Sequence, residues 1–209
     1  MSKLITPTRH PSLVLAERGS SSAGRPAGRV SKQDWLEKAL EVFKSRGIDA
    51  VRVVDLARSL DVSKSGFYWH FKDRAELLEG MKRYWVDEFS RRFIDDTYAR
   101  EGPLRERLVS LIRAIRASDS GRLDLAFTAW AQADPAVRET IDRVRDMRVS
   151  FIKDLLSKSD VSHEQLTTRA RLFVVYFSWS EVMFEPNKHG LSREDLDTVL
   201  DIIVGDNQS

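Results

Sequence analysis

The chain has 209 residues, of which 42% are hydrophobic and 32% charged, and its formal net charge is +2. This balance is typical of a globular protein, and no apolar run is long enough to predict a membrane-spanning helix. The absence of cysteine excludes disulfides and thiol redox chemistry and fits a reducing compartment. We therefore expect a cytoplasmic protein with no membrane partner.

The first 30 residues differ in composition from the rest of the chain. They are rich in serine, proline and glycine, and they hold five basic residues against one acidic residue. This composition predicts a disordered basic arm over residues 1–30. Residues 31–80 hold nine basic and nine acidic residues, so any positive surface there requires that charge be segregated onto one face.

A first helix is predicted to begin at Ser31, because the stretch from Ser31 to Asp34 resembles a capping box. Gly47 is a suitable stop for this helix. Between these ends, apolar residues recur at helical spacing, which predicts one buried face. These apolar residues are Leu36, Ala39, Leu40 and Phe43.

Two short helices separated by a tight turn follow in the stretch VVDLARSLDVSKSGFYWHFKDRAELL, residues 53–78. Apolar residues at i, i+3, i+4 and i+7 predict a helix from Val53 to Leu60. Asp61 is typical of a turn, and the Ser63 side chain can accept from the first free amides of the next helix. That helix, from Lys64 to His70, completes the spacing of a helix-turn-helix, whose second helix enters the DNA major groove.

The segment from Trp35 to Met81 resembles the DNA-binding domain of the TetR family of regulators. The match includes the Leu56-Ala57 pair, the Val62-Ser63 turn, the aromatic residues around His70 and the Leu77-Leu78 pair. One departure is Arg52, which stands where the family usually has a Thr or Ser cap. A side-chain cap is worth about 1 kcal/mol, so that helix start is weaker or is capped in another way.

The resemblance implies that this segment binds double-stranded operator DNA. In the family, the residues that match Tyr68 and Lys72 usually contact phosphates. Gly66 lets the backbone approach the DNA closely. Trp69 is either a packing residue or a base contact, and we favour packing. The candidate DNA-binding residues are Arg52, Ser63, Lys64, Ser65, Gly66, Tyr68, His70 and Lys72. In the preceding arm, Arg25 and Arg29 are either part of a solvated tail or the first contacts to a minor groove.

The rest of the chain predicts further helices and no strand. A fourth helix starts at Asp73 and runs to about Phe93, and Gly102-Pro103 breaks the chain after it. A loop is expected at residues 118–121. The helices are expected at residues 104–115, 123–133, 135–157, 163–184 and 192–205. The run from Leu172 to Phe184 is nearly apolar all round, so we expect it to be buried on most sides.

Aromatic residues beyond position 80 are either plain core or the lining of a small-molecule pocket. The resemblance favours the pocket, because TetR-family proteins enclose an effector in this helical domain. The candidate pocket residues are Trp85, Phe89, Phe93, Phe127, Trp130, Tyr176 and Trp179. Glu181 interrupts an apolar run, so it has a basic partner, faces solvent or meets a ligand, in that order of preference.

No catalytic or metal site is apparent in the sequence. The four histidines, His10, His70, His163 and His189, are not at the spacing of metal ligands. No nucleophile elbow or phosphate-binding glycine loop is present. We expect no cofactor and no enzymatic activity. An enzyme or ligand carrier with a vestigial helix-turn-helix is the less favoured reading, and failure to bind any DNA would support it.

Together these patterns predict an all-α, homodimeric transcriptional regulator with two folded domains. The first, residues 31–80, is a three-helix domain with the helix-turn-helix, and the second, residues 81–205, is larger and binds an effector and a second copy. The expected function is a repressor released from a palindromic operator by an apolar or aromatic small molecule. The alternative is a helix-turn-helix DNA-binding protein without a small-molecule effector.

Overall fold

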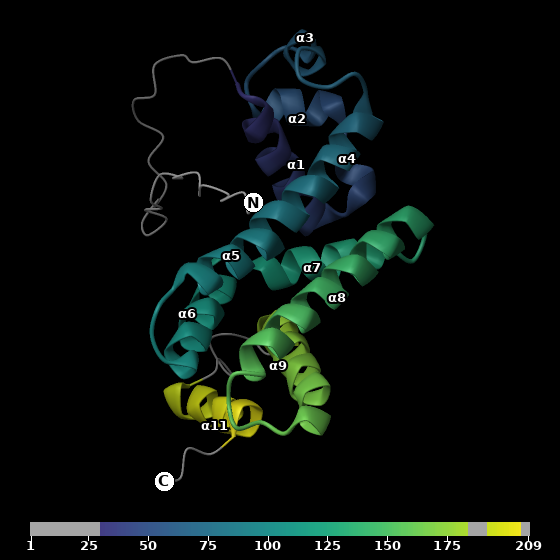
Figure 1. Cartoon of the computed structure of the whole chain (residues 1–209). Coiled ribbons are helices and arrows are strands. Elements are labelled where there is room, and N and C mark those ends of the chain that lie inside the picture. The colour runs from purple at the N-terminus through teal and green to yellow at the C-terminus, as the bar shows by residue number, and fades with distance from the viewer. Residues whose placement is uncertain (1–29, 184–191, 206–209) are drawn as a thin grey trace, which may run out of the picture.

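The computed structural model describes residues 30–183 and 192–205, which form helices and no strand (Figure 1). The elements are α1 (Lys32–Arg46), the 3-10 turn η1 (Ile48–Ala50), α2 (Val53–Ser59), α3 (Lys64–Tyr68), α4 (Arg74–Val86), the π-helical turn η2 (Asp87–Arg91), α5 (Arg92–Ala99), α6 (Leu104–Ala117), α7 (Ser120–Trp130), α8 (Pro135–Leu156), α9 (His163–Met183) and α11 (Arg193–Val204). The predicted all-α class is confirmed. Among these helices, none combines the length and the apolar character that a bilayer crossing requires.

Helix α1 starts and stops where the sequence predicts. The Ser31 hydroxyl accepts from the Asp34 amide at 3.2 Å, while the Asp34 carboxylate accepts from the Ser31 amide at 2.7 Å, which completes the capping box. Gly47 ends the helix at a positive φ of 78°, a conformation that glycine adopts without strain. The inner face of α1 is fully buried and forms the base on which the next two helices pack.

The helix-turn-helix forms as predicted, with two local differences. Asp61 takes the turn at a φ of 54°, which is tolerated by a short polar side chain. Helix α3 ends at Tyr68 rather than at His70. Our prediction that Ser63 caps α3 through its side chain is wrong, because the Ser63 hydroxyl instead lies 2.6 Å from the Ser65 hydroxyl. The Arg52 side chain likewise gives α2 no cap and donates from Nε to the Asp49 carbonyl at 3.2 Å.

The helix that leaves the helix-turn-helix is longer than the sequence predicts. We expected it to end near Phe93, but its helical path continues through η2 and α5 to Ala99. Within η2 the Arg92 amide donates to the Asp87 carbonyl, five residues back, so one extra residue is inserted into the helix. The path runs from the helix-turn-helix into the middle of the larger helical part (Figure 1).

The predicted loop at residues 118–121 is shorter in the structure. Only Ser118 and Asp119 separate α6 from α7, and Asp119 takes a left-handed conformation with a φ of 53°. Helix α7 therefore begins at Ser120 and ends at Trp130, about a turn earlier than expected. The next helix starts as predicted, since Asp134 caps α8 through its carboxylate and Pro135 is the first helical residue.

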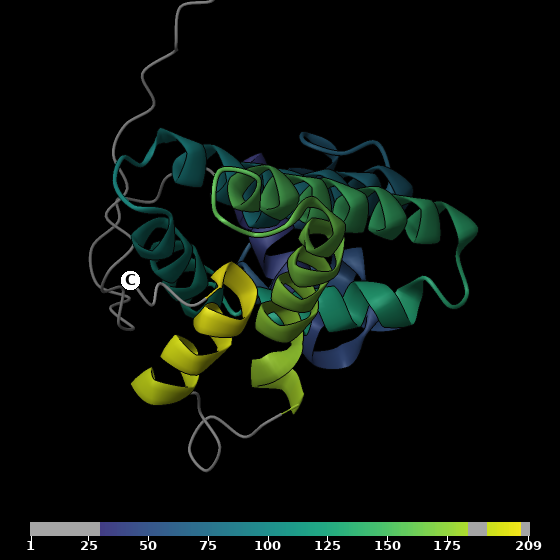
Figure 2. The same ribbon diagram turned by 60° about the horizontal axis from the view of Figure 1, so that its bottom comes forward.

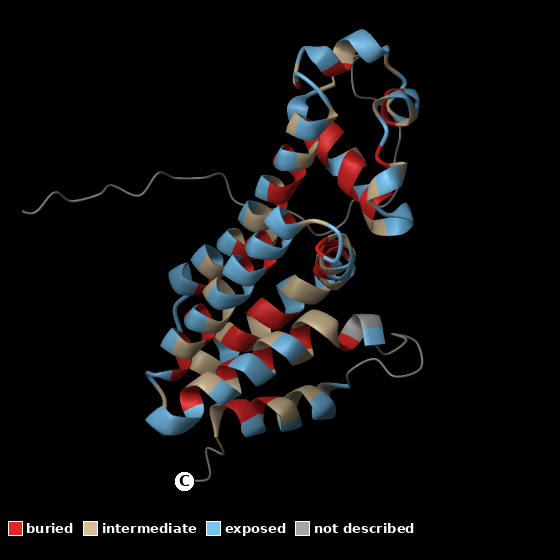
Figure 3. Ribbon diagram, turned by 90° about the vertical axis from the view of Figure 1, so that its right-hand side faces the viewer, coloured by how far each residue is buried: buried red, intermediate tan, exposed pale blue. Residues whose placement is uncertain are grey.

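Helix α9 lies among α6, α7, α8 and α11, as the view from the far end shows (Figure 2). We expected its apolar run to be buried on most sides, and this expectation is wrong for the isolated chain. Leu172 and Val175 are 49% and 62% exposed, and Met183 is 71% exposed. Buried positions follow the inward faces of the helices, while the outward face of α9 is open (Figure 3).

Two hydrophobic clusters hold the described residues together. The first continues from α1 and α4 into α7 and the first half of α8, and the second joins α6, the end of α8, α9 and α11. The first cluster is joined by a stack in which Phe127 of α7 lies 4.3 Å from Trp85 and 4.9 Å from Phe43, measured between ring centroids. The core of the helix-turn-helix thus does not end at residue 80, and the predicted domain boundaries stay a prediction.

Replacing Phe127 by alanine is expected to lower the free energy of unfolding by about 3–5 kcal/mol, because a fully buried aromatic ring is lost from the stack. Leu125→Ala, at a position of the same helix that is 41% exposed, is the matched control and is expected to cost less than about 1 kcal/mol. Urea unfolding followed by circular dichroism measures both. Equal losses for the two variants would contradict the proposed role of the stack.

Candidate functional site

Helix α3 presents an open face at one tip of the molecule (Figure 1). Phe67 and Phe71 are buried and their rings stack at 5.2 Å, which anchors the helix on α1. Tyr68 points outward and is 62% exposed. Our interpretation of Trp69 as a packing residue is wrong, because its side chain is 75% exposed. The open face therefore carries two adjacent aromatic side chains.

The cations around α3 are free of carboxylates, whereas many others on this part of the chain are paired. Lys32, Lys38 and Arg58 lie within 4 Å of acidic side chains. Within the described residues, no carboxylate lies within ion-pairing distance of Arg52, Lys64 or Lys72, and all three are exposed. A segment with equal numbers of acidic and basic residues thus presents unpaired positive charge at its tip.

Buried polar contacts hold this tip in place. Arg74 of α4 donates to the carbonyls of Val51 and Ile48 at 2.7 Å each, which fixes the turn that leads into α2. A ring nitrogen of His70 lies 2.8 Å from the Val30 carbonyl, so this half-buried side chain ties the segment after α3 to the segment before α1. The predicted contact of His70 with DNA stays a prediction.

Gly66 lies on α3 with open space where a side chain would point. An added Cβ atom would meet only a Val62 methyl group, at 4.0 Å. Core packing therefore does not require glycine at this position, and the predicted close approach of Gly66 to DNA stays a prediction. Ser65 and Lys64 are exposed beside it. The arm residues Arg25 and Arg29 lie outside the described residues.

An apolar cavity lies in the larger helical part, between η2–α5, α6, α8 and α9. Its space open to the centre of a water-sized sphere is about 40 Å³, enough for roughly two or three waters. Of the predicted pocket residues, Phe89 and Phe93 line it. The remaining lining is aliphatic, aromatic or serine, except for Arg148. Leu111, Ile115, Phe151, Ile152, Phe173 and Phe177 complete most of the apolar wall.

A second small cavity, also of about 40 Å³ by the same measure, adjoins the first. Trp85 and Trp179, both predicted pocket residues, line it, and Arg148, Val174 and Ser178 line both cavities. The structure places Phe127 and Trp130 in the stack against α1, and Tyr176 lines neither cavity. The binding roles of the predicted residues stay a prediction. The Glu181 side chain lies outside the described part.

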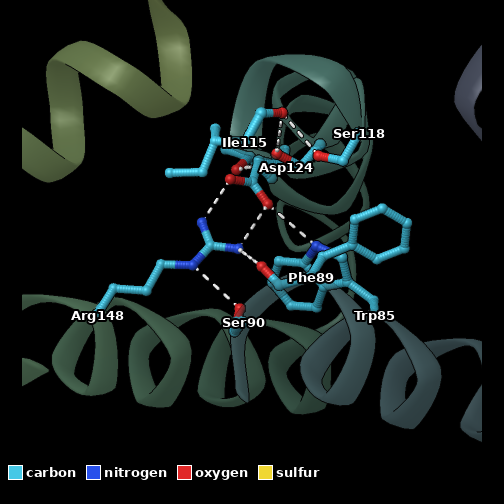
Figure 4. A network of polar contacts seen from close by, with 9 residues as sticks. Trp85, Phe89, Ser90, Ile115, Ser118, Asp124 and Arg148 are labelled. Atoms are coloured by element: carbon cyan, nitrogen blue, oxygen red, sulfur yellow. Dashed lines mark hydrogen bonds and ion pairs between the residues drawn. The ribbon is translucent and has the colours of Figure 1, made fainter. Parts of the chain in front are cut away.

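A buried ion pair stands between the two cavities (Figure 4). Arg148 of α8 contacts the Asp124 carboxylate of α7 through Nη1 at 2.5 Å and Nη2 at 3.2 Å. The same guanidinium donates to the Ser90 hydroxyl at 3.0 Å and to the Phe89 carbonyl at 3.1 Å, both in η2. Asp124 also accepts from Trp85 Nε1 at 3.0 Å. One charged pair therefore joins α4, η2, α7 and α8.

Sequence reasoning missed both members of this pair. Arg148 and Asp124 are 24 residues apart, and no helical spacing connects them. A signal was present, because Asp124 is a carboxylate within an apolar helix and a buried carboxylate requires a partner. Which of the many arginines supplies the partner depends on the tertiary fold.

The described residues hold no group of His, Cys, Asp and Glu side chains that could bind a metal ion. The two features with functional character are thus the exposed, cationic α3 face and the cavities beside the helix that carries it. This combination defines the class of helix-turn-helix proteins with an attached helical domain.

Comparison with known proteins relates the helix-turn-helix part of the chain to a family. Residues 36–81 match the family described as bacterial regulatory proteins, tetR family. The repressor KstR2 of Mycobacterium tuberculosis is 32% identical over 92 residues, 43% of this chain and 46% of that protein. The regulator LuxR of Vibrio harveyi is 32% identical over 99 residues, 46% of this chain and 48% of that protein. These matches span less than half of the curated relatives' own length.

Solved structures share the fold over most of the chain. A transcriptional regulator from Rhodococcus sp. Rha1 aligns with a TM-score of 0.64 at 18% identity, over 84% of this chain and 94% of that one. AibR, solved in complex with isovaleryl coenzyme A and operator DNA, aligns with a TM-score of 0.63 at 19% identity, over 83% and 97% of the two chains. Residues 36–81 thus match the tetR family of regulatory proteins, and the chain shares the fold of these solved regulators over most of its length.

Proposed function

We propose that this protein is a repressor that binds a palindromic operator and is released from it by an apolar small molecule. The observation that carries the proposal is one continuous helical path, α4–η2–α5, with the cationic α3 face at its start and the cavity wall at η2. AibR, a protein of the same fold, was solved with both a small molecule and operator DNA, which supports a fold that accommodates both.

The DNA contacts are assigned from exposure and charge. Tyr68, Lys64 and Ser65 lie on the open face of α3, and Arg52 and Lys72 flank it without carboxylate partners among the described residues. Arginine and lysine in this arrangement neutralise phosphates and release counterions, while the side chains of α3 read base edges. In a dimer, the two α3 helices would contact half-sites about 34 Å apart.

The small volume of the cavities favours one alternative, a DNA-binding regulator without an effector. A drug-sized ligand needs a pocket of about 300–1,000 Å³, so an effector that binds in either of these two cavities must displace side chains or join the cavities before it fits. The alternative predicts that no compound bound in the helical part changes operator affinity.

Lys72→Ala is expected to weaken operator binding at every sequence alike and to lower the slope of log affinity against log salt by about 1, because one phosphate contact is lost. Tyr68→Phe should also weaken binding without changing sequence preference. Fluorescence anisotropy against fragments selected from random DNA measures both. Lys158→Ala, at an exposed lysine beyond the end of α8, is the matched control. Equal affinity of the unmodified protein for selected and random fragments would contradict the proposal.

The open face of α9 is proposed as part of a homodimer interface. Leu172, Val175 and Met183 lie on one side of the helix and are about half or more exposed. Helix α8 exposes mainly charged and polar side chains, so α9 carries the apolar area. A four-helix contact between two copies would cover this face.

Val175→Glu is expected to convert a dimer into a monomer at micromolar concentration, because a charge would be buried in an apolar contact. Leu125→Glu, at an exposed apolar position of α7, is the matched control and should leave the dimer intact. Light scattering gives the mass of each, and circular dichroism checks that each remains folded. A stable, folded monomer of the unmodified protein would refute the assignment.

Effector and operator binding are expected to oppose each other. A compound found by thermal-shift screening should weaken operator binding by roughly 5- to 150-fold, and operator DNA should weaken its binding by the same factor. Val174→Phe, which narrows both cavities, should reduce compound affinity and leave operator affinity of the free protein unchanged. Leu125→Phe is the control. If every tightly bound compound leaves operator affinity unchanged, the alternative without an effector holds.

A further inference from the structure

Among the described residues that line the first cavity, Arg148 is the only one with a charged side chain, and it also lines the second cavity. A guanidinium does not lose its proton in a protein, so the positive charge at this wall is permanent. Asp124, which is 7% exposed, lies against it and cancels that charge. The opposite charges of Arg148 and Asp124 therefore offset each other at this wall.

The hydrogen bonds that Arg148 makes with the described residues use only part of its N–H groups. Of its five N–H groups, Nε donates to Ser90, Nη2 donates to Asp124 and to the Phe89 carbonyl, and Nη1 donates once to Asp124. These contacts use four donors and leave one Nη1 hydrogen available to a ligand atom. The other polar side chains of the first cavity are serine hydroxyls.

We propose that Asp124 makes the effector cavity selective for uncharged ligands, and that the effector is a neutral, mostly apolar molecule with one hydrogen-bond acceptor, such as a ketone or an ester. The proposal rests on the effector site proposed above. The acceptor takes the remaining N–H of Arg148, while the apolar body lies among Phe93, Phe151 and Phe177.

Electrostatics exclude the charged counterparts of such a ligand. A carboxylate would place a second negative charge beside Asp124, with one cation shared between them in a poorly solvated site. Binding would then require that one of the two carboxyl groups take up a proton. A ligand cation would meet the permanent charge of Arg148. A neutral acceptor incurs neither cost.

The substitution that tests this idea is Asp124→Asn. The amide oxygen of asparagine can still accept from Trp85 Nε1 and from Arg148, so the junction keeps hydrogen bonds while it loses its negative charge. The cavity wall then carries the unbalanced charge of Arg148. The variant should therefore prefer an anion where the unmodified protein prefers a neutral ligand.

The experiment compares 2-octanone with octanoate, two probes with eight carbon atoms that differ in charge, by calorimetric titration of the full chain without DNA. The unmodified protein is expected to bind 2-octanone at least about tenfold more tightly than octanoate at pH 7, and Asp124→Asn is expected to reverse this order. The double variant Asp124→Asn/Arg148→Gln, which has neither charge, should again prefer 2-octanone.

Asp87→Asn is the matched control, because it makes the same change in an exposed ion pair with Arg91 on η2 and should leave the ratio of affinities within about twofold. Thermal unfolding confirms that each variant is folded. The proposal is overturned if the unmodified protein binds octanoate as tightly as 2-octanone, or if folded Asp124→Asn keeps the original order. It is also overturned if neither probe binds more tightly than about 1 mM. Because no DNA is present, these outcomes are independent of operator binding.

Discussion

The Arg148–Asp124 pair is the contact on which the arrangement of the helices depends. This pair joins α7 and α8 to the π-helical turn at the end of α4 (Figure 4). A buried ion pair adds little stability compared with apolar side chains of the same size, because both charges must be desolvated. The pair instead fixes the geometry of the contact, since the planar guanidinium donates hydrogen bonds in fixed directions.

The Arg148–Asp124 pair contacts the connecting helix at its π-helical turn, η2. An inserted residue disturbs the regular ladder of backbone hydrogen bonds and is a common feature of functional helices. Here the Phe89 carbonyl accepts from Arg148, and the Ser90 hydroxyl accepts from the same side chain. The irregular part of the connecting helix is thus held by the side chain that lines both cavities. A ligand that shifts Arg148 acts on η2 directly, within one turn of α4.

The sequence was sufficient to predict most features that depend on local chemistry, the side-chain cap at Ser63 being an exception. The capping box at Ser31, the turn at Asp61 and the proline start of α8 all form in the structure, because each is decided by residues a few positions apart. The other errors have a common cause. The end of the connecting helix, the exposure of Trp69 and the open face of α9 depend on which distant surfaces meet, and periodicity carries no information on that.

In the candidate site, too, the local motif was predictable from the sequence, whereas contacts between distant residues were not. The α3 residues could be named from the register of the motif, while the lack of described carboxylates near Arg52, Lys64 and Lys72 became visible only in three dimensions. The aromatic residues predicted for a single pocket separate into two groups, one in the stack around Phe127 and one along the cavities. These groups meet at Trp85, which packs on Phe127 and donates to Asp124. The stack that supports the helix-turn-helix and the wall of the cavities therefore share one side chain, so a change on either side reaches the other through direct contact.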